Sequence, residues 1–242
     1  MKFFELKINV DLKIPIHFQK SPEAVSKLIA TSLISSGFER HKNNEPKNYV
    51  FSNLGKADAK GFFEKGNIYF RSFDENLAKK VLNSLFLYED NIFKVKGVDF
   101  KKIKYKKINY MLSLNPVFVV MKNGDFWTFQ KNGDLINLMS ALQDNLIRKY
   151  EMFFNEKLKP ENNFMELIQI KNNKPQTYYY KGIKFFGWKF YIAPRNDEVS
   201  QKLAFTALGT GLGHKQCSRR RFYEMGIKVY DKLLKLFCKG VL

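Results

Sequence analysis

A glycine-rich segment followed by a basic run, residues 205–226, contains the residue types that bind anions. Its glycines stand at alternate positions, and the cations after them meet no acid until Glu224: Gly209, Gly211 and Gly213, then Lys215, Arg219, Arg220 and Arg221. Glycine allows positive φ and close approach of another chain, and exposed amides in such a turn can surround an anion. Adjacent guanidinium groups add bidentate recognition of phosphate. The segment is predicted to hold a polyanion, and the alternative is a helix cap followed by a solvated basic face.

The spacing of these glycines fits neither of the common nucleotide-binding loops. Read from Gly209, the pattern G-x-x-x-x-G-K-[ST] requires glycine at His214 and a hydroxyl residue at Gln216. The pattern G-x-G-x-x-G also requires its last glycine at His214. A mononucleotide enzyme is therefore disfavoured.

The composition indicates a folded protein with an anionic partner. Of the 242 residues 45% are hydrophobic, which is enough for a core. Lysine and arginine number 42 against 23 acidic residues, giving a net charge of +19. Such an excess favours a nucleic acid or an anionic membrane as partner. Aromatic residues make up 16%, and some of the 12 tyrosines could stack on unpaired bases.

The two cysteines and the charged N-terminal residues favour a cytoplasmic protein without a metal centre or cofactor. Cys217 and Cys238 are too few for a cysteine-only zinc site or a disulfide framework, and their spacing matches no metal motif. Glu5, Lys7 and Asp11 interrupt any signal-peptide core. No run approaches the ~18 apolar residues of a membrane span, although peripheral binding stays open.

The first half of the chain has the periodicity of a β-α-β-β-α-β unit. Apolar residues alternate over 2–12, and Pro15 is expected to end that strand. Ser21 is the expected N-cap of a helix that Gly37 stops, and Asp74 is the expected cap of a second helix. Strands are predicted at 49–51, at 67–73 after Gly66, and up to residue 110. The order is that of a ferredoxin-like domain, whose lysine-rich stretch 101–107 is either a solvated edge strand or an RNA-facing ridge.

The second half is predicted to repeat this order. A strand over 112–121 contains Pro116 and so belongs at an edge or a bulge. Asp134 caps a long helix, strand-like segments follow at 164–171 and 177–192, and Asp197 opens a helix to about Leu208. A last strand near 222–230 and a basic tail helix over 231–239 follow. The predicted fold is therefore α+β, with tandem ferredoxin-like (RRM-like) βαββαβ domains at residues 1–111 and 112–242 around a central basic cleft.

Four short elements, in this order and spacing, make the sequence resemble the CRISPR repeat-RNA endoribonucleases of the RAMP superfamily. They are spread over nearly the whole chain: Tyr49-Val50-Phe51-Ser52-Asn53-Leu54, Leu114-Asn115-Pro116-Val117, Asp144-Asn145-Leu146-Ile147-Arg148-Lys149-Tyr150 and Gly211-Leu212-Gly213. The resemblance implies a metal-independent endoribonuclease that cleaves CRISPR precursor RNA within each repeat. Its partners would be the precursor and the mature guide RNA. Other effector subunits and a homodimer stay open.

The resemblance implies a reaction in which the 2′-hydroxyl of the RNA attacks the adjacent phosphate and the 5′-oxygen leaves. Histidine suits both proton transfers and a cationic side chain suits the phosphate oxygens. His41 and Lys47, in the loop after the first helix, stand where the family has its catalytic histidine and lysine. His214 is the rival histidine, more suited to phosphate contact, and His17 is expected to be structural. The RNA clamp would comprise Gly211, Gly213, His214, Lys215, Arg219, Arg220 and Arg221.

Two departures from the family pattern keep a second function open. Ala30 occupies the helix position at which many members carry a tyrosine, and residues 218–223 replace the second glycine cluster. The alternative is therefore a catalytically silent RNA-binding subunit of a CRISPR effector. A basic peripheral membrane or ribosome-associated protein is the third hypothesis. Salt-sensitive binding without cleavage would select the second, and preference for anionic vesicles the third.

Overall fold

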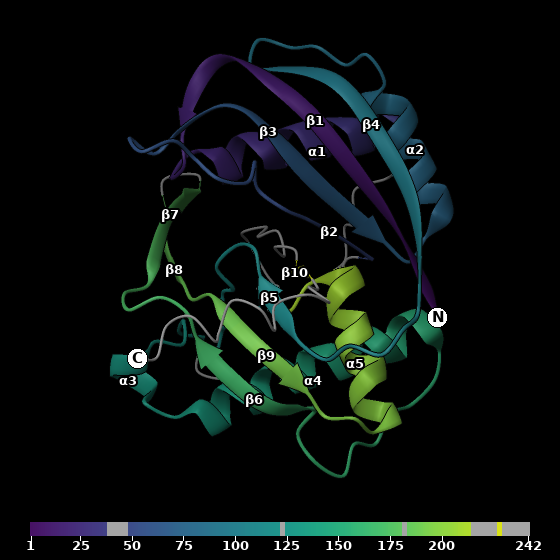
Figure 1. Cartoon of the computed structure of the whole chain (residues 1–242), viewed down its shortest axis with the longest axis vertical. Coiled ribbons are helices and arrows are strands. Elements are labelled where there is room, and N and C mark those ends of the chain that lie inside the picture. The colour runs from purple at the N-terminus through teal and green to yellow at the C-terminus, as the bar shows by residue number, and fades with distance from the viewer. Residues whose placement is uncertain (38–47, 122–123, 181–182, 214–226, 229–242) are drawn as a thin grey trace, which may run out of the picture.

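The computed structural model describes residues 1–37, 48–121, 124–180, 183–213 and 227–228 of the chain. They form two α+β units, one in each half of the molecule as it is viewed in Figure 1, with α5 between them. His41, Lys47, His214, Lys215 and the arginine run 219–221 lie outside the described residues, as does the tail helix predicted over 231–239.

The first unit has the element order and the strand order of a ferredoxin-like domain. Its antiparallel sheet has the order β2-β3-β1-β4 and carries two helices on one face, which are visible in Figure 1. The elements are β1 (Lys2–His17), α1 (Ser21–Ser35), β2 (Tyr49–Phe51), β3 (Phe62–Ser72), α2 (Glu75–Leu85) and β4 (Phe93–Lys104). Each of these helices buries an apolar face against the sheet, with Val25, Leu28 and Ile29 on α1 and Leu77, Val81 and Leu85 on α2.

The second unit repeats this arrangement with an inserted hairpin. Its sheet has the order β10-β5-β9-β6, and β7 and β8 pair with each other as a separate hairpin. The elements are β5 (Met111–Ser113), α3 (Phe129–Asn132), α4 (Leu135–Phe154), β6 (Met165–Ile170), β7 (Gln176–Tyr180), β8 (Ile183–Gly187), β9 (Phe190–Pro194), α5 (Glu198–Thr210) and β10 (Ile227–Lys228). The tandem ferredoxin-like prediction therefore holds for the strand order of both sheets, whereas the division at residue 112 into two domains stays a prediction.

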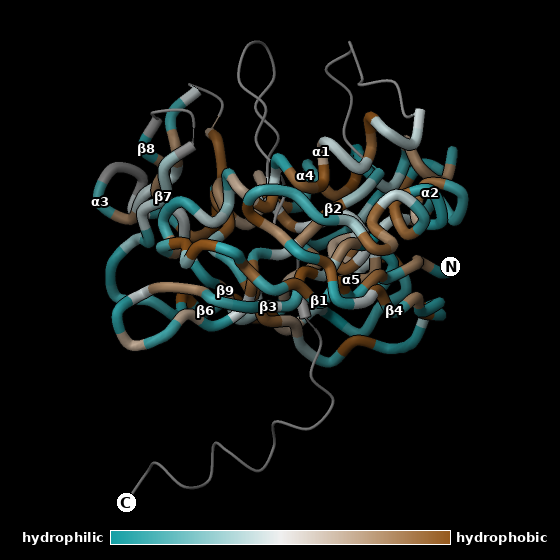
Figure 2. Tube along the Cα trace, turned by 90° about the horizontal axis from the view of Figure 1, so that it is seen from above, coloured by the Kyte–Doolittle hydropathy of each residue, from teal (hydrophilic) through white to brown (hydrophobic). Residues whose placement is uncertain are grey.

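Several local predictions are confirmed by side-chain contacts. Asp74, Asp134 and Asp197 each cap the helix that follows, because a carboxylate oxygen accepts a backbone N–H of its first turn. From Phe4 to Val10 of β1 every second residue is buried and those between are partly exposed. Hydrophobic and hydrophilic stretches interchange along the chain in Figure 2. The lysine-rich stretch begins on β4, which is an edge strand, and Lys102 and Lys104 are exposed on it.

Other predictions in the first unit were wrong. Pro15 does not end β1, because β1 loses its register with β3 between Asp11 and Ile16, where the missing N–H of proline is not needed. Ser21 is not an N-cap: Lys20 holds that position without a side-chain cap, and the Ser21 hydroxyl donates to the Phe18 carbonyl at 2.8 Å. Gly66 lies inside β3 rather than before it.

In the second unit two predicted strands are divided. The segment 112–121 contributes only the short β5, which lies inside its sheet, and Pro116 follows it, beside an isolated bridge between Val117 and Trp188. The aromatic segment 177–192 turns back on itself, because β7 and β8 pair with each other before β9 joins the main sheet.

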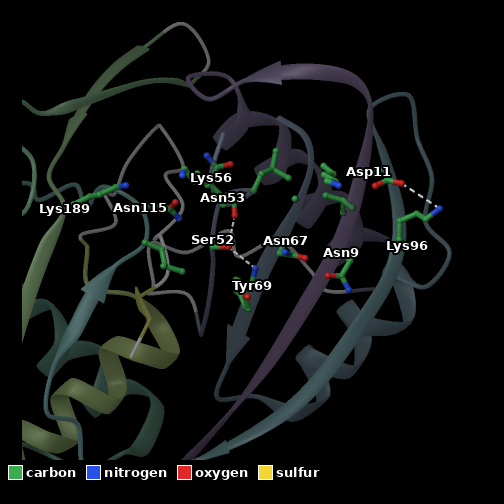
Figure 3. Close-up of a pocket in the computed structure, with 16 residues that line it drawn as sticks. Asn9, Asp11, Ser52, Asn53, Lys56, Asn67, Tyr69, Lys96, Asn115 and Lys189 are labelled. Carbon is green, nitrogen blue, oxygen red and sulfur yellow. Dashed lines mark hydrogen bonds and ion pairs between the residues drawn. The ribbon is translucent and has the colours of Figure 1, made fainter. Parts of the chain in front are cut away.

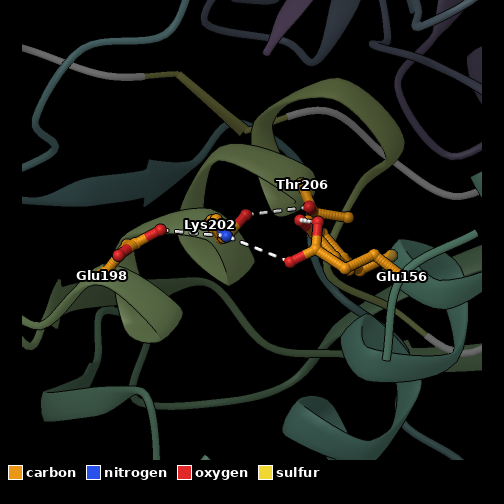
Figure 4. A network of polar contacts seen from close by, with 5 residues as sticks. Glu156, Glu198, Lys202 and Thr206 are labelled. Atoms are coloured by element: carbon orange, nitrogen blue, oxygen red, sulfur yellow. Dashed lines mark hydrogen bonds and ion pairs between the residues drawn. The ribbon is translucent and has the colours of Figure 1, made fainter. Parts of the chain in front are cut away.

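Helix α5 is fixed against both units. A lysine network joins its first turns to the end of α4: Lys202 Nζ donates to Glu156 at 3.1 Å and to Glu198 at 3.0 Å, as Figure 4 shows. At its other end the Arg71 guanidinium of β3 donates to the Leu208 carbonyl at 3.1 Å and pairs with Glu5 at 2.7 Å. The end of α5, where the glycine segment begins, is thereby connected to the first unit.

Candidate nucleic-acid interface

A pocket of about 750 Å³ lies where the open face of the first sheet meets the second unit. Figure 3 shows it with Lys189 and Asn115 at one end and Asp11 and Lys96 at the other. The first unit supplies most of the lining, from β1, β3, β4 and the loop 52–56, and the second unit supplies Leu114, Asn115 and Lys189. The site therefore depends on how the two units meet.

The pairing of β1 with β3 fixes which side chains enter the pocket. Because alternate residues of a strand face opposite sides, burial of Ile8 and Val10 beneath the helices turns Asn9 and Asp11 to the open face. Across the ladder Asn9 pairs with Asn67, and Asp11 pairs with Lys65. This part of the sheet presents amides and charges.

The loop 52–56 lies directly on β3. The Asn67 N–H donates to the Leu54 carbonyl at 3.2 Å, and the Tyr69 N–H donates to Ser52 Oγ at 2.9 Å. A Cβ on Gly66 would stand 2.4 Å from the Leu54 carbonyl oxygen, so only glycine allows the loop to approach so closely. This contact sets the wall of the pocket that carries Asn53 and Lys56.

Lysines make the pocket positive. Lys56, Lys65, Lys96 and Lys189 line it against one carboxylate, that of Asp11, whose distance to Lys96 Nζ is 3.8 Å. Burial lowers the pKa of Lys189 from its ordinary value, because desolvation disfavours the ammonium form. An anionic ligand would stabilise the ammonium form of Lys189, so a phosphate suits the end of the pocket at which Lys189 lies.

Two buried asparagines add polar atoms without a partner among the described residues: Asn53 Oδ1 and Asn115 Nδ2. The orientation of Asn53 is fixed because its Nδ2 donates to Ser21 Oγ at 2.7 Å, and that hydroxyl donates onward to the Phe18 carbonyl. Buried polar groups in native proteins are rarely left unpaired. Unpaired amide atoms beside a pocket are typical of a site that a polar ligand completes.

The end of the glycine segment contacts the residues that follow the pocket-lining Leu114 and Asn115. Gly213 packs closely against Val117 and Phe118: a Cβ at position 213 would lie 3.1 Å from the Phe118 carbonyl oxygen. Gly211 has φ of 82°, which favours glycine. Of the two glycines predicted to bind RNA, Gly213 is therefore placed beside the segment that follows Asn115, whereas the predicted cationic part of the clamp lies outside the described residues.

His17 packs in an aromatic cluster and does not line the pocket. Its ring packs on Phe18 and Phe62, with ring centroids 4.5 and 5.2 Å away, and its Nδ1 accepts the Gln19 N–H at 3.5 Å. This is the structural role expected of it. The candidate catalytic pair, His41 and Lys47, stays a prediction.

Sequence reasoning missed the pocket lysines and the buried Lys149. Lys149 is fully buried, and its Nζ donates to three carbonyls at the end of α5. A usable signal was present, since Ser52, Asn53, Leu54, Leu114 and Asn115 come from two of the four elements that carry the family resemblance and line one pocket.

Solved structures with this arrangement cover nearly the whole chain. A CRISPR-associated protein Cas6 superposes with a TM-score of 0.69 at 16% identity, over 95% of this chain and 100% of that one. A RAMP protein described as binding different RNA substrates superposes with 0.65 at 18% identity, over 94% and 100%. The product of a Cas6-related gene from Pyrococcus furiosus gives 0.65 at 17% identity, over 95% and 99%. The chain has the Cas6 fold.

The Cas6 likeness rests on structure, since no family model and no curated protein matches the sequence. Within the described parts of the chain, no three His, Cys, Asp or Glu side chains gather in a way that could hold a metal ion. None of the helices described in the structure is long and apolar enough to cross a membrane.

Proposed function

We propose that the chain is an endoribonuclease that cleaves CRISPR precursor RNA within its repeats and releases guide RNA in the cytoplasm. The observation that carries this proposal is the Cas6 fold over 95% of the chain, with a lysine-lined pocket between its two units. The net charge of +19 supports an RNA partner. The similar RAMP protein binds different RNA substrates.

In the proposed reaction the RNA supplies its own nucleophile. A base removes the proton of one 2′-hydroxyl, the 2′-oxygen bonds to the adjacent phosphorus, and the bond from phosphorus to the 5′-oxygen breaks. An acid returns a proton to the leaving 5′-oxygen, so the products are a 2′,3′-cyclic phosphate and a 5′-hydroxyl. A cation stabilises the crowded phosphate oxygens in the transition state.

His41 is proposed for the proton transfers and Lys47 for the phosphate oxygens, with the glycine segment and the basic run after it holding the RNA. The pocket lysines would bind the backbone of an unpaired stretch, and Tyr69 offers a ring at the pocket wall on which a base could stack. No step needs a metal ion.

The test is incubation of the purified chain with a cognate repeat RNA in EDTA. Cleavage should leave a cyclic phosphate, and a 2′-O-methyl group just upstream of the cut should stop it. Replacement of His41 by Ala should slow cleavage by about a hundredfold or more with binding nearly intact. Cutting of the 2′-blocked RNA would refute the mechanism, whereas an unchanged rate for H41A would transfer the role to His214.

A second candidate, a repeat-RNA-binding subunit that does not cut, is favoured by the alanine at position 30. The family tyrosine is absent there, and Ala30 lies in the described helix α1. Tight, salt-dependent binding of the repeat with no cyclic phosphate formed would select this function. Association with other effector subunits or with a second copy stays a prediction of the resemblance.

A further inference from the structure

Three lysines gather at one end of the first sheet, where the N-terminus lies beside the end of β4 (Figure 1). Lys104 of β4 pairs directly with Lys2 of β1, and Lys102 pairs with Phe4. Alternate residues of a strand share a face, and directly paired residues face the same side. The side chains of Lys2, Lys102 and Lys104 therefore project from one face of the sheet, and all three are exposed. We call this surface the lysine ridge.

The lysine ridge is separate from the pocket. Asn9 lines the pocket and pairs with Gly97, whereas the Lys2–Lys104 pair lies further along the same two strands. The seven residues from position 9 to position 2 of β1 span roughly 23 Å. The ridge shares its face of the sheet with the buried Phe4, whereas Asn9 points to the open face. The two surfaces therefore bind separate parts of any ligand that reaches both.

The positive charge of the lysine ridge is not balanced by acids. Among the described residues, none of Lys2, Lys102 and Lys104 forms an ion pair with a carboxylate. The hydrogen bond from Lys79 chiefly lowers the pKa of Glu75, and the charges of Lys2 and Lys102 add to this effect. That carboxylate pairs with Lys79 at 2.9 Å and so leaves the ridge with its charge.

Protection of an exposed sheet edge explains only part of this arrangement. Lysines on an edge strand such as β4 discourage pairing with another chain. Lys2, however, belongs to β1, which lies inside the sheet between β3 and β4, so its charge protects no edge. Like charges directly opposite each other destabilise a sheet. An anion bound to the ridge would offset the repulsion between Lys2 and Lys104.

One transverse row of the first sheet connects the ridge to the point at which the chain enters β2. The row consists of directly paired residues on β2, β3, β1 and β4: Tyr49, Ser72, Phe4 and Lys102. Neighbouring strands lie ~4.8 Å apart, so the backbones of Tyr49 and Lys102 are roughly 14 Å apart. The Ser72 hydroxyl also donates to the Asn48 carbonyl at 2.6 Å, and Lys47 directly precedes Asn48 in the sequence. A few nucleotides of RNA span this distance.

We propose that the lysine ridge is a second RNA-binding surface, which holds backbone phosphates a few nucleotides from the linkage that is cut. This rests on the proposed function for the identity of the ligand and for the position of the cut. Lysine suits the role because its ammonium group is a point charge on a flexible stem. Contacts to phosphates fix the register of a strand without reading its bases. The ridge therefore adds affinity and positions the strand, whatever its sequence.

The test compares the ridge variant K102Q/K104Q with the control K20Q/K27Q. All four lysines are exposed in the first unit and none lines the pocket, so both variants lose the same charge. Binding is measured with a repeat RNA that carries a 2′-O-methyl group just upstream of the cut, so that cleavage does not interfere. The ridge variant should bind about tenfold or more weakly at ~0.1 M salt, because two phosphate contacts are lost. Its slope of log affinity against log salt concentration should be shallower by about 1.4, and the control should bind like the native chain.

A second readout locates the phosphates that the ridge holds. Methylphosphonate linkages carry no charge, and one is placed at a time along the repeat RNA. At a phosphate that contacts the ridge, this change should weaken binding to the native chain and to K20Q/K27Q, and should have no effect on K102Q/K104Q. These linkages should lie within a few nucleotides of the cut.

Equal RNA affinities of K102Q/K104Q and the native chain would overturn the proposal. Self-association of that variant with unchanged RNA affinity would assign the lysines to edge protection alone. Loss of binding to phosphatidylserine vesicles with unchanged RNA affinity would assign them to a membrane surface instead. RNA that is bound through the ridge but not cut would refute only the nuclease function, because the difference between the two variants would persist.

Discussion

Replacement of Gly209 by Ala tests how closely α5 approaches the first unit. A Cβ at this position would lie 2.6 Å from Phe73 Cε2 and 2.7 Å from its Cζ. Phe73 cannot withdraw easily, because its ring packs among four others: Phe3, Phe153, Phe154 and Phe205. The substitution therefore forces overpacking at the contact between the two units.

Two effects of opposite sign decide the outcome. Alanine in place of glycine favours a helix by at most ~1 kcal/mol, and less near a helix end such as this one. Overpacking of a filled core costs about 1–3 kcal/mol. We expect G209A to lower the free energy of unfolding by roughly 1 kcal/mol, and the melting temperature by about 2–4 °C for a chain of this size.

The matched control removes the Phe73 ring that the new methyl group would meet. In a Phe73→Leu background the ring atoms that meet the new methyl group are absent, so G209A should become neutral or stabilising by up to ~1 kcal/mol. Urea unfolding of the four proteins gives the coupling free energy. If G209A stabilises the native chain, or if the two substitutions are additive, the close contact between α5 and Phe73 does not exist in solution.

Three further outcomes are expected. In urea unfolding, the double variant E5Q/R71M should be less destabilised than R71M alone. The single substitution leaves the largely buried Glu5 carboxylate without its guanidinium partner, which costs roughly 3–5 kcal/mol. Equal losses of unfolding free energy in the two variants would contradict the pairing. In RNA titrations at several salt concentrations, K56Q and K189Q should each reduce the slope of log affinity against log salt concentration by about 0.7 per lost phosphate contact. The control K79Q, at an exposed lysine on α2 outside the pocket, should leave the slope unchanged. Burial raises the pKa of Tyr178 to about 12. Since the folded state holds this proton more tightly than the unfolded state, the free energy of unfolding should be constant below pH ~10 and fall between pH ~10 and 12. Y178F should remove this fall from a plot of melting temperature against pH, and a Y178F plot that matches the native one would show that Tyr178 does not cause it.

Local patterns in the sequence were sufficient to predict most elements of the fold. Alternation of apolar residues located β1, helical spacing located α1 and α4, and Asp74, Asp134 and Asp197 marked helix starts, because each of these signals acts within a few residues. The repeated β-α-β-β-α-β order then predicted the strand order of both sheets.

Local patterns failed where a distant contact decided the conformation. Ser21 has the residue type and position of an N-cap, but its hydroxyl binds the Phe18 carbonyl and accepts from Asn53, 32 positions along the chain. Gly66 was predicted to precede a strand, whereas it lies inside β3, where the close approach of the Leu54 carbonyl requires glycine.

The sequence by itself determined the fold class, the excess of positive charge and the glycine segment as a candidate anion site, since composition and periodicity are properties of neighbouring residues. Only the tertiary structure decided which lysines share a pocket and which one is buried. Lys149 looks like any charged residue of an amphipathic helix until its three carbonyl partners, more than 60 positions away, are in place. A buried ammonium is stable only where such acceptors surround it, and that surrounding exists only after the two helices have packed.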